Sequence, residues 1–471
     1  MGYGRLETSR RKDPSDMVTI VPIETPSLGD RSYLVHDGAT AFVVDPQRDI
    51  DRILDLARRD GVTITHVFET HLHNDYVTGG LALAREVGAT YHVSAADDVE
   101  YERSPVVDGQ VVRVSDRLSV RAIATPGHTF THLSYALEDQ DQVIGVFSGG
   151  SLLFGATGRP DLLGPDHSEA LARHQYASAH RLAAELPDSA QVLPTHGFGS
   201  FCSAGETTAD ATESTIGAEK QSNPAFSQAE EDWVRQTLDG LDAYPAYYVH
   251  MGPANAAGPG APDLTLPARA DRDTIARRIE AGDWVVDLRH RTAFAAGFVD
   301  GTVNVGLDGQ FATYIGWLLP WGTPVTLLGD SPEQVAGAQR ELVRIGIDRL
   351  AGAATGQPSD WTDGTPATFR RGTFADLEEV RHHRRVGVLD VRRTSEHDDG
   401  HIEGAVNIPI HELIGRLHEI PDGEVWVHCA TGYRASIAAS LLARHGVRVV
   451  LVDDDFDARA AEVGLPIVAA G

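Results

Sequence analysis

The chain has 471 residues, a formal net charge of −28 and 42% hydrophobic residues. A chain of this length commonly forms about three domains of roughly 150 residues each. The hydrophobic content excludes a wholly disordered protein. The strong negative charge excludes a nucleic-acid partner, which would need a basic surface. No apolar run approaches the ~18 residues of a membrane-spanning helix, so we expect no membrane partner.

The chain contains two cysteines, Cys202 and Cys429, which cannot supply a disulfide framework. This cysteine usage fits a reducing compartment, so we predict a cytoplasmic location. Residues 1–16 are polar and lack the apolar core of a signal peptide, and we interpret them as a loose tail.

From residue 17 to about 205, short β-rich runs alternate with a few helical stretches, which predicts a layered α/β domain. Segments rich in Pro, Gly and Ala at 252–267 and 352–367 indicate linkers. We therefore predict three units, at residues 17–250, 268–351 and 366–471.

The last two units are related to each other. Residues 285–305 (VVDLRHRTAFAAGFVDGTVNV) match residues 388–408 (VLDVRRTSEHDDGHIEGAVNI) without a gap. The matched pairs are Asp287 and Asp390, Arg289 and Arg392, Gly297 and Gly400, Gly301 and Gly404, and Asn304 and Asn407. Because turn glycines match as well as apolar positions, we infer that one domain is duplicated.

Histidines follow several expected strands of the first unit. The stretch ETHLHNDYVTGG at 69–80 carries His71, His73 and Asp75 at alternate positions. His128 lies in TPGHTFTHLSY and His196 in LPTHGFGSFC, each after another expected strand. Chemistry commonly lies at such strand ends, and neutral imidazoles could converge there on one cation. The alternative is a set of polar turns whose histidines meet solvent.

These motifs, together with FSGGSLLFGATGRPDL, resemble the metallo-β-lactamase superfamily, especially its persulfide dioxygenase and glyoxalase II branch. The resemblance implies an αβ/βα sandwich with a metal site at one sheet edge. It also implies a loop HxHxDH and a later aspartate in FTGD. Here Tyr76 replaces the last histidine of the loop and Gly150 replaces the aspartate, which disfavours a second metal ion.

One ferrous ion per chain is the cofactor that the resemblance implies, with zinc as the alternative. We predict His71, His73 and His128 as its ligands. Asp75, His196 and Asp161 are further candidates, as ligands or as partners that orient a ligand.

Two other residues of the first unit are candidates for substrate chemistry. Arg159, in GRPDL, resembles an arginine near the family's substrate pocket and suits the carboxylate of a thiol substrate; it could equally pair with Asp161. Cys202 follows His196 by six positions and is a possible sulfur relay, although a lone cysteine is more often a small core residue.

The segment EVWVHCATGYRASIAASLLARHG predicts a strand, a tight loop and a helix. Successive backbone N–H groups in such a loop stabilise an anion and favour a thiolate at Cys429. Gly432 permits the tight turn, and Arg434 begins the helix. The alternative is a buried structural cysteine.

This segment resembles the rhodanese (sulfurtransferase) family, as does LDVRRTSEHDDGHIEGAVNIP. Arg434 follows Cys429 by five positions, whereas the related phosphatases use six. The resemblance implies Cys429 and Arg434 as catalytic residues, an anion loop of Ala430, Thr431, Gly432 and Tyr433, and a structural ion pair between Asp390 and Arg392. In the first copy, Gly329 and Asp330 stand where the cysteine loop would begin, so residues 268–351 resemble an inactive rhodanese-like module.

The order of the three units resembles persulfide dioxygenase–rhodanese fusions. We therefore expect an enzyme that oxidises a low-molecular-weight persulfide with O₂ and transfers sulfane sulfur through Cys429 to sulfite, giving thiosulfate. One alternative is a glyoxalase II-like zinc thioester hydrolase joined to a rhodanese. Another is an inactive metal domain, with only the rhodanese active and the whole chain a sulfur carrier or scaffold. The inactive copy also makes a homo-oligomer the expected assembly.

Overall fold

The computed structural model describes residues 18–205 and 212–469, and the tail expected at 1–16 lies outside them. The chain forms two compact units. Unit 1 comprises Met1–Tyr244 and Tyr248–Pro262, and unit 2 comprises Pro245–Tyr247 and Asp263–Gly471. The second and third predicted units thus share one compact unit, and their separate bounds stay a prediction.

Unit 1 contains two six-stranded sheets. The first has the order β1 (Thr19–Thr25), β2 (Asp30–His36), β3 (Thr40–Val44), β4 (Thr63–Phe68), β5 (Thr90–Ser94) and β6 (Ser104–Val106). The second has the order β14 (Ser214–Thr215), β12 (Gln191–Pro194), β10 (Gln142–Gly149), β9 (Leu133–Asp139), β8 (Leu118–Ala124) and β7 (Val111–Arg113). A two-stranded sheet pairs β11 (Thr157–Gly158) with β13 (Ser203–Ala204).

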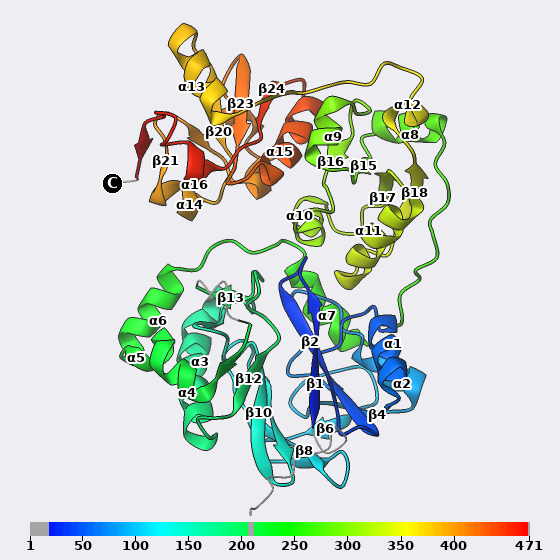
Figure 1. Cartoon of the computed structure of the whole chain (residues 1–471), viewed down its shortest axis with the longest axis vertical. Helices are drawn as coiled ribbons and strands as arrows, with labels where there is room; N and C mark the ends of the chain where they lie inside the picture. The colour runs from blue at the N-terminus through cyan, green and yellow to red at the C-terminus, as the bar shows by residue number, and fades with distance from the viewer. Residues whose placement is uncertain (1–17, 206–211, 470–471) are drawn as a thin grey trace, which may run out of the picture. The chain divides into compact units, whose positions relative to one another are not determined.

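Helices cover the outer faces of both large sheets. They are α1 (Asp51–Asp60), α2 (Gly80–Val87), α3 (Pro165–Glu185), α4 (Ile216–Ser222), α5 (Pro224–Ser227), α6 (Glu230–Asp239) and α7 (Tyr248–Ala257). Figure 1 shows α1 and α2 outside the first sheet and α3 and α4 outside the second. The longest helix, α3, begins with Pro165, whose fixed φ suits the first turn, and buries Leu171, Ala172, Ala179 and Leu182.

Three apolar cores separate these layers. The core between the sheets includes Tyr33, Phe42, Phe68, Tyr135 and Phe147. A second core lies under α1 and α2, and a third under α3 and α6. Alternate residues of each strand point to opposite faces, so strands buried on both sides serve two cores at once. The expected αβ/βα sandwich is confirmed.

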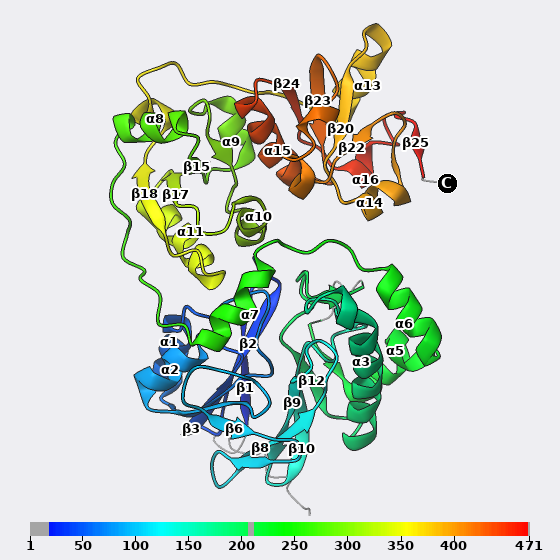
Figure 2. The ribbon, with the colours of Figure 1, turned by 180° about the vertical axis from the view of Figure 1, so that it is seen from behind.

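Unit 2 contains two parallel sheets with the same internal strand order (Figure 2). One runs β16 (Val303–Asn304), β15 (Trp284–Asp287), β17 (Val325–Gly329) and β18 (Leu350–Thr355). The other runs β22 (Val406–Asn407), β20 (Gly387–Asp390), β23 (Glu424–His428), β24 (Arg448–Val452) and β19 (Arg370–Gly372). A small sheet pairs β21 (His401–Ile402) with β25 (Ile467–Val468).

The helices of unit 2 connect these strands. Around the first sheet they are α8 (Arg272–Glu280), α9 (Arg291–Ala296), α10 (Phe311–Leu318), α11 (Pro332–Arg344) and α12 (Pro358–Trp361). Around the second they are α13 (Phe374–His383), α14 (Thr394–Asp399), η2 (Ile410–Glu412), η3 (Leu417–Glu419), α15 (Tyr433–Arg444) and α16 (Phe456–Arg459).

The matched positions of the repeat make the same bonds in both copies. Arg289 binds the Asp287 carboxylate and the carbonyl of Gly297, with Nη2–O distances of 2.7 and 2.8 Å. In the second copy, Arg392 binds Asp390 and the carbonyl of Gly400, both at 2.7 Å. The expected Asp390–Arg392 ion pair is therefore confirmed, and its counterpart stabilises the first copy.

No helix among the described residues is both long enough and apolar enough to cross a bilayer.

Candidate functional sites

Four buried histidines gather at the carboxyl ends of strands in unit 1. His71 and His73 follow β4, His128 follows β8 and His196 follows β12. Their side chains are at most 1% exposed. Ring centroids in neighbouring pairs lie 4.1 to 5.8 Å apart. The four histidines therefore come from the edges of both large sheets.

Each of the four imidazoles has one ring nitrogen held by a polar partner. The pairs are His71 Nδ1 with Thr70 Oγ1 at 2.8 Å, His73 Nε2 with Glu69 Oε2 at 3.2 Å, His128 Nδ1 with the Arg159 carbonyl at 2.9 Å, and His196 Nδ1 with Asp30 Oδ1 at 2.9 Å. Histidines that bind metals are commonly oriented in this way.

The opposite nitrogens are placed to receive a cation. Nδ1 of His73 and Nε2 of His128 are buried and have no hydrogen-bond partner. Nε2 of His71 and Nε2 of His196 lie 3.3 Å apart. Donor atoms of His71, His128 and His196 all lie within 4.8 Å of one another. The residues therefore fit a divalent transition metal such as iron or zinc, which imidazole suits.

The charge states differ across the cluster. Burial lowers the pKa of His71, and it lowers the pKa of His128 to about 3, so both rings are neutral donors. Burial opposes charge on His73 as well, but the carboxylates of Asp45 and Glu69 outweigh it and raise the pKa to about 9. A cation that binds here displaces a proton, as is usual for histidine sites.

Tyr76, which replaces the last histidine of the family's loop, contacts His73 instead of the centre of the cluster. Its ring stacks on His73 at a centroid distance of 4.2 Å, and its hydroxyl lies 3.0 Å from His73 Nε2. The same hydroxyl donates to the carbonyl of Asp45 at 3.2 Å. Nε2 of His73 thus has two partners, Glu69 and Tyr76.

Asp75 contacts the outer nitrogen of another histidine. Its Oδ2 lies 3.1 Å from Nδ1 of His196, beside the contact from Asp30. Burial opposes a proton on His196, but Asp75 and Asp30 raise the pKa of His196 well above its ordinary value. Asp75 also belongs, with His73 and His196, to a group of donor atoms that could hold a cation, so both roles considered for Asp75 stay predictions.

Gly150 leaves no room for the missing aspartate. A Cβ atom on Gly150 would lie 2.4 Å from Cδ2 of His128, closer than real Cβ contacts. The Gly150 N–H donates to Nε2 of His132 at 3.1 Å, and its carbonyl accepts from Gln175 at 3.0 Å. The backbone here packs against the histidines in place of a carboxylate.

Arg159 and Asp161 lie beside the histidines but engage each other. Two nitrogens of Arg159 donate to the Asp161 carboxylate at 2.7 and 2.8 Å. Arg159 also donates to the carbonyls of Phe201 and Asp242 at 3.1 and 2.7 Å. The pairing with Asp161, considered as the alternative to substrate binding, is present.

Cys202 is fully buried, and its Sγ lies 3.8 Å from the hydroxyl of Tyr248. Burial, with Asp75 and Asp30 adding to it, raises the pKa of the Cys202 thiol well above its ordinary value. Since the thiolate is the nucleophile, this environment opposes a sulfur-relay role.

Cys429 in unit 2 is surrounded by a loop built for an anion. It follows β23 directly and is 2% exposed. The backbone N–H of Gly432 donates to its Sγ at 3.2 Å. Gly432 has φ +95°, which favours glycine, and it precedes the first turn of α15. Thr431 is exposed and Ala430 is half-buried, so the loop is open to solvent on one side.

Arg434 binds a carboxylate that the sequence analysis did not single out. Its Nη1 and Nη2 donate to Glu396 at 2.6 and 2.7 Å. Glu396 also accepts from the side chain of Arg393 at 3.0 Å. The guanidinium therefore braces the Cys429 loop against α14.

The first copy of the repeat forms one wall of this loop. Tyr433 donates its hydroxyl to the carbonyl of Gly306 at 2.8 Å, and Ser436 donates to Asn304 at 2.6 Å. Tyr314 lies 5.8 Å from Tyr433, centroid to centroid. Burial raises the pKa of Tyr314 to about 12, with Arg434 opposing and Cys429 adding to the rise. The aromatic ring of Tyr314 thus shares the surroundings of Cys429.

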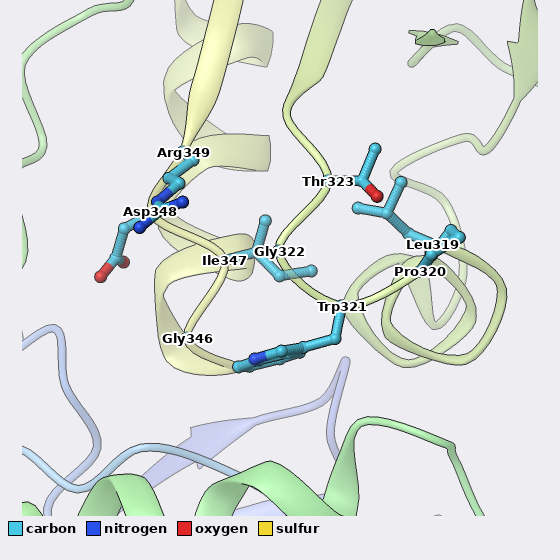
Figure 3. A pocket seen from close by; sticks show the side chains of 9 residues that line it. All are labelled: Leu319, Pro320, Trp321, Gly322, Thr323, Gly346, Ile347, Asp348 and Arg349. Carbon is cyan, nitrogen blue, oxygen red and sulfur yellow. The ribbon is translucent and has the colours of Figure 1, made fainter. Parts of the chain in front are cut away.

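Unit 2 also contains a cavity of about 370 Å³ between the end of α10 and the start of β18 (Figure 3). The Trp321 indole lies along one side, and Asp348 and Arg349 lie on another. None of the site residues predicted from the sequence lines this cavity.

Comparison with known proteins matches two parts of the chain to families. The metallo-beta-lactamase superfamily matches residues 30–196, and the rhodanese-like domain matches residues 373–462. The crystal structure of a metallo-beta-lactamase from Staphylococcus aureus subsp. aureus COL superposes with a TM-score of 0.65 and 29% identity, covering 73% of this chain and all of that one.

Two curated relatives match part of the chain. The human mitochondrial persulfide dioxygenase ETHE1 is 26% identical over 216 residues, 44% of this chain and 73% of that protein. A hydroxyacylglutathione hydrolase of Rhodopseudomonas palustris is 35% identical over 131 residues, 27% of this chain and 49% of that protein. The chain spans about half the length of the first curated relatives that it matches.

Proposed function

The chain is a fusion of a metallo-beta-lactamase domain, which has persulfide dioxygenase homologues, with a C-terminal rhodanese-like domain, and we propose that it oxidises persulfides and transfers sulfane sulfur. The observation that carries the proposal is the presence of two distinct sites in one chain. One is a cluster of four oriented imidazoles, and the other is Cys429 in an anion-stabilising loop.

The histidine cluster would hold a single ferrous ion, with His71, His73 and His128 among its donors. The bound iron would supply the site where a low-molecular-weight persulfide meets O₂. The overall reaction consumes one O₂ and one water for each persulfide and releases the thiol, sulfite and two protons. The residues around the cluster orient the imidazoles, and the buried walls exclude bulk water.

Cys429 would perform the transfer. Its thiolate attacks the outer sulfur of a persulfide, so that an Sγ–S bond forms while the S–S bond of the persulfide breaks and the carrier thiolate leaves. Sulfite then attacks the bound sulfur, giving thiosulfate and restoring the Cys429 thiolate. The Gly432 N–H donates to Sγ at 3.2 Å and stabilises the Cys429 thiolate. Covalent catalysis thereby divides one difficult transfer into two easier ones.

A zinc thioester hydrolase is the second candidate, because a hydroxyacylglutathione hydrolase is among the relatives. Hydrolysis of this kind uses two metal ions that clamp a nucleophilic oxygen. Tyr76 and Gly150 stand where two of the family's metal ligands would be, and the space at Gly150 is closed. The residues present therefore suit one ion better than two.

Metal analysis and oxygen uptake of the purified full chain separate these functions. About one iron per chain with O₂ consumption that depends on persulfide supports the proposal. Stoichiometric zinc with thioester cleavage supports the hydrolase. A folded chain that retains no metal but transfers sulfur would leave only Cys429 active.

A further inference from the structure

His196 lacks two of the metal-binding neighbours that the family's pattern would place beside it. In the family's loop, Asp75, the histidine at position 76 and the later aspartate would accompany it at a second metal ion. Here position 76 is Tyr76, which contacts His73 and Asp45, and position 150 is glycine. Asp75 lies on the outer Nδ1 of His196, opposite Nε2.

The inner nitrogen of His196 faces the other imidazoles. Nε2 of His196 lies 3.3 Å from Nε2 of His71, and the His128 donor atom lies within 4.8 Å of both. Two ring nitrogens at this separation can share one cation. The ring centroids of His196 and His128 are 5.3 Å apart, as are those of His196 and His71.

Two carboxylates fix this orientation. Asp30 and Asp75 contact the same Nδ1 atom at 2.9 and 3.1 Å, and all three side chains are buried. A carboxylate behind a histidine sets its tautomer and strengthens it as a ligand. The negative charge that an aspartate ligand would bring is thus placed behind His196 instead.

We propose that His196 replaces the missing aspartate as a ligand of the same metal ion and binds it through Nε2 beside His71 and His128. This inference rests on metal binding as stated in the proposed function, but it does not depend on which reaction the ion supports. Gly150 permits this arrangement. Because it has no Cβ atom, the His128 ring can occupy the space that an aspartate side chain would need.

The test is a titration of the metal-free full chain with Co²⁺, followed by the visible ligand-field bands. The wild type should bind one ion. His196→Gly should weaken binding about 100-fold or more, because loss of a supporting partner alone costs about 10–100-fold. Added imidazole should restore both affinity and bands in His196→Gly. His36→Gln is the matched control, since His36 is a buried histidine at the far end of β2 from Asp30.

Wild-type affinity and bands in His196→Gly would overturn the proposal. X-ray absorption of the cobalt-loaded wild type and of cobalt-loaded His196→Gly is a second readout, because the proposal requires the variant to lose one imidazole nitrogen and an unchanged count would contradict it. Neither readout depends on catalytic turnover. A protein in which His196 binds the metal ion but which shows no persulfide-dependent O₂ uptake would therefore refute the proposed function and leave this inference intact.

Discussion

Arg434 and Glu396 are joined by two hydrogen bonds, of 2.6 and 2.7 Å, that tie the Cys429 loop to α14. Arg434 was predicted from the sequence as a catalytic residue beside Cys429. Its guanidinium pairs with a carboxylate 38 positions earlier in the chain, and its catalytic role stays a prediction. This contact indicates that Arg434 positions the loop.

Glu396→Gln should destabilise the chain at neutral pH by about 1–3 kcal/mol, because it leaves Arg434 without its charged partner. Burial would raise the pKa of Glu396, but Arg434 outweighs it and lowers the pKa from 4.5 to about 2. The pair therefore stabilises the fold above about pH 4.5, and this contribution is lost as the pH falls toward 2.

Calorimetric melting of the wild type and Glu396→Gln from pH 7 to pH 3 checks this dependence, with the difference in melting temperature narrowing at low pH. Glu419→Gln is the control, because Glu419 pairs with Arg416 at the surface and should matter less. A difference that widens on acidification would contradict the ion-pair account.

Cys429→Ser should abolish sulfur transfer from thiosulfate to cyanide, by at least about a thousandfold, since it removes the nucleophile. Oxygen uptake at the histidine cluster should persist. Cys202→Ser is the matched control and should retain sulfur transfer, because the Cys202 thiol is buried in the other unit. Transfer that survives in Cys429→Ser, or fails in Cys202→Ser, would refute the assignment.

Gly309→Ala, in the first copy of the repeat, should disturb the Cys429 loop. A Cβ on Gly309 would lie 2.6 Å from the Tyr433 ring, and overpacking of this kind costs about 1–3 kcal/mol. Gly337→Ala is the control, because its Cβ would lie 3.9 Å from the nearest side chain, within a helix that favours alanine. Sulfurtransferase kinetics and denaturant unfolding measure the effect. Equal kinetics and equal unfolding of the two variants would show that the first copy does not support the Cys429 loop.

Gly150→Ala should weaken metal retention about 10–100-fold, since its Cβ would displace the His128 ring. Metal content after dialysis against a chelator measures the loss. Gly260→Ala is the control, because no atom would lie within 4 Å of its Cβ. Unchanged metal content in Gly150→Ala would show that His128 tolerates the shift or does not bind metal.

Much of the architecture could be predicted from local patterns. Strand-end histidines come together because strands of a layered α/β domain end at a common edge, and the repeat fixed a shared strand order in unit 2. Asp45 and Glu69 also directly follow strands, and the structure adds both as partners of His73.

Other contacts join positions too distant for a single sequence to reveal. Asp30 and His196 are 166 positions apart, and Glu396 and Arg434 are 38 apart. Gly309 and Tyr314 pack against the Cys429 loop because the two copies associate. The sequence pattern within each copy does not reveal how they associate. These long-range contacts orient the histidines and the cysteine loop.

Oxygen uptake by the iron-loaded full chain, with glutathione persulfide as substrate, tests the central claim most directly. We expect O₂ consumption that requires both persulfide and iron, with sulfite accumulating in Cys429→Ser and thiosulfate appearing in the wild type. An iron-loaded, folded chain that consumes no O₂ with persulfide, while sulfur transfer at Cys429 proceeds, would contradict it.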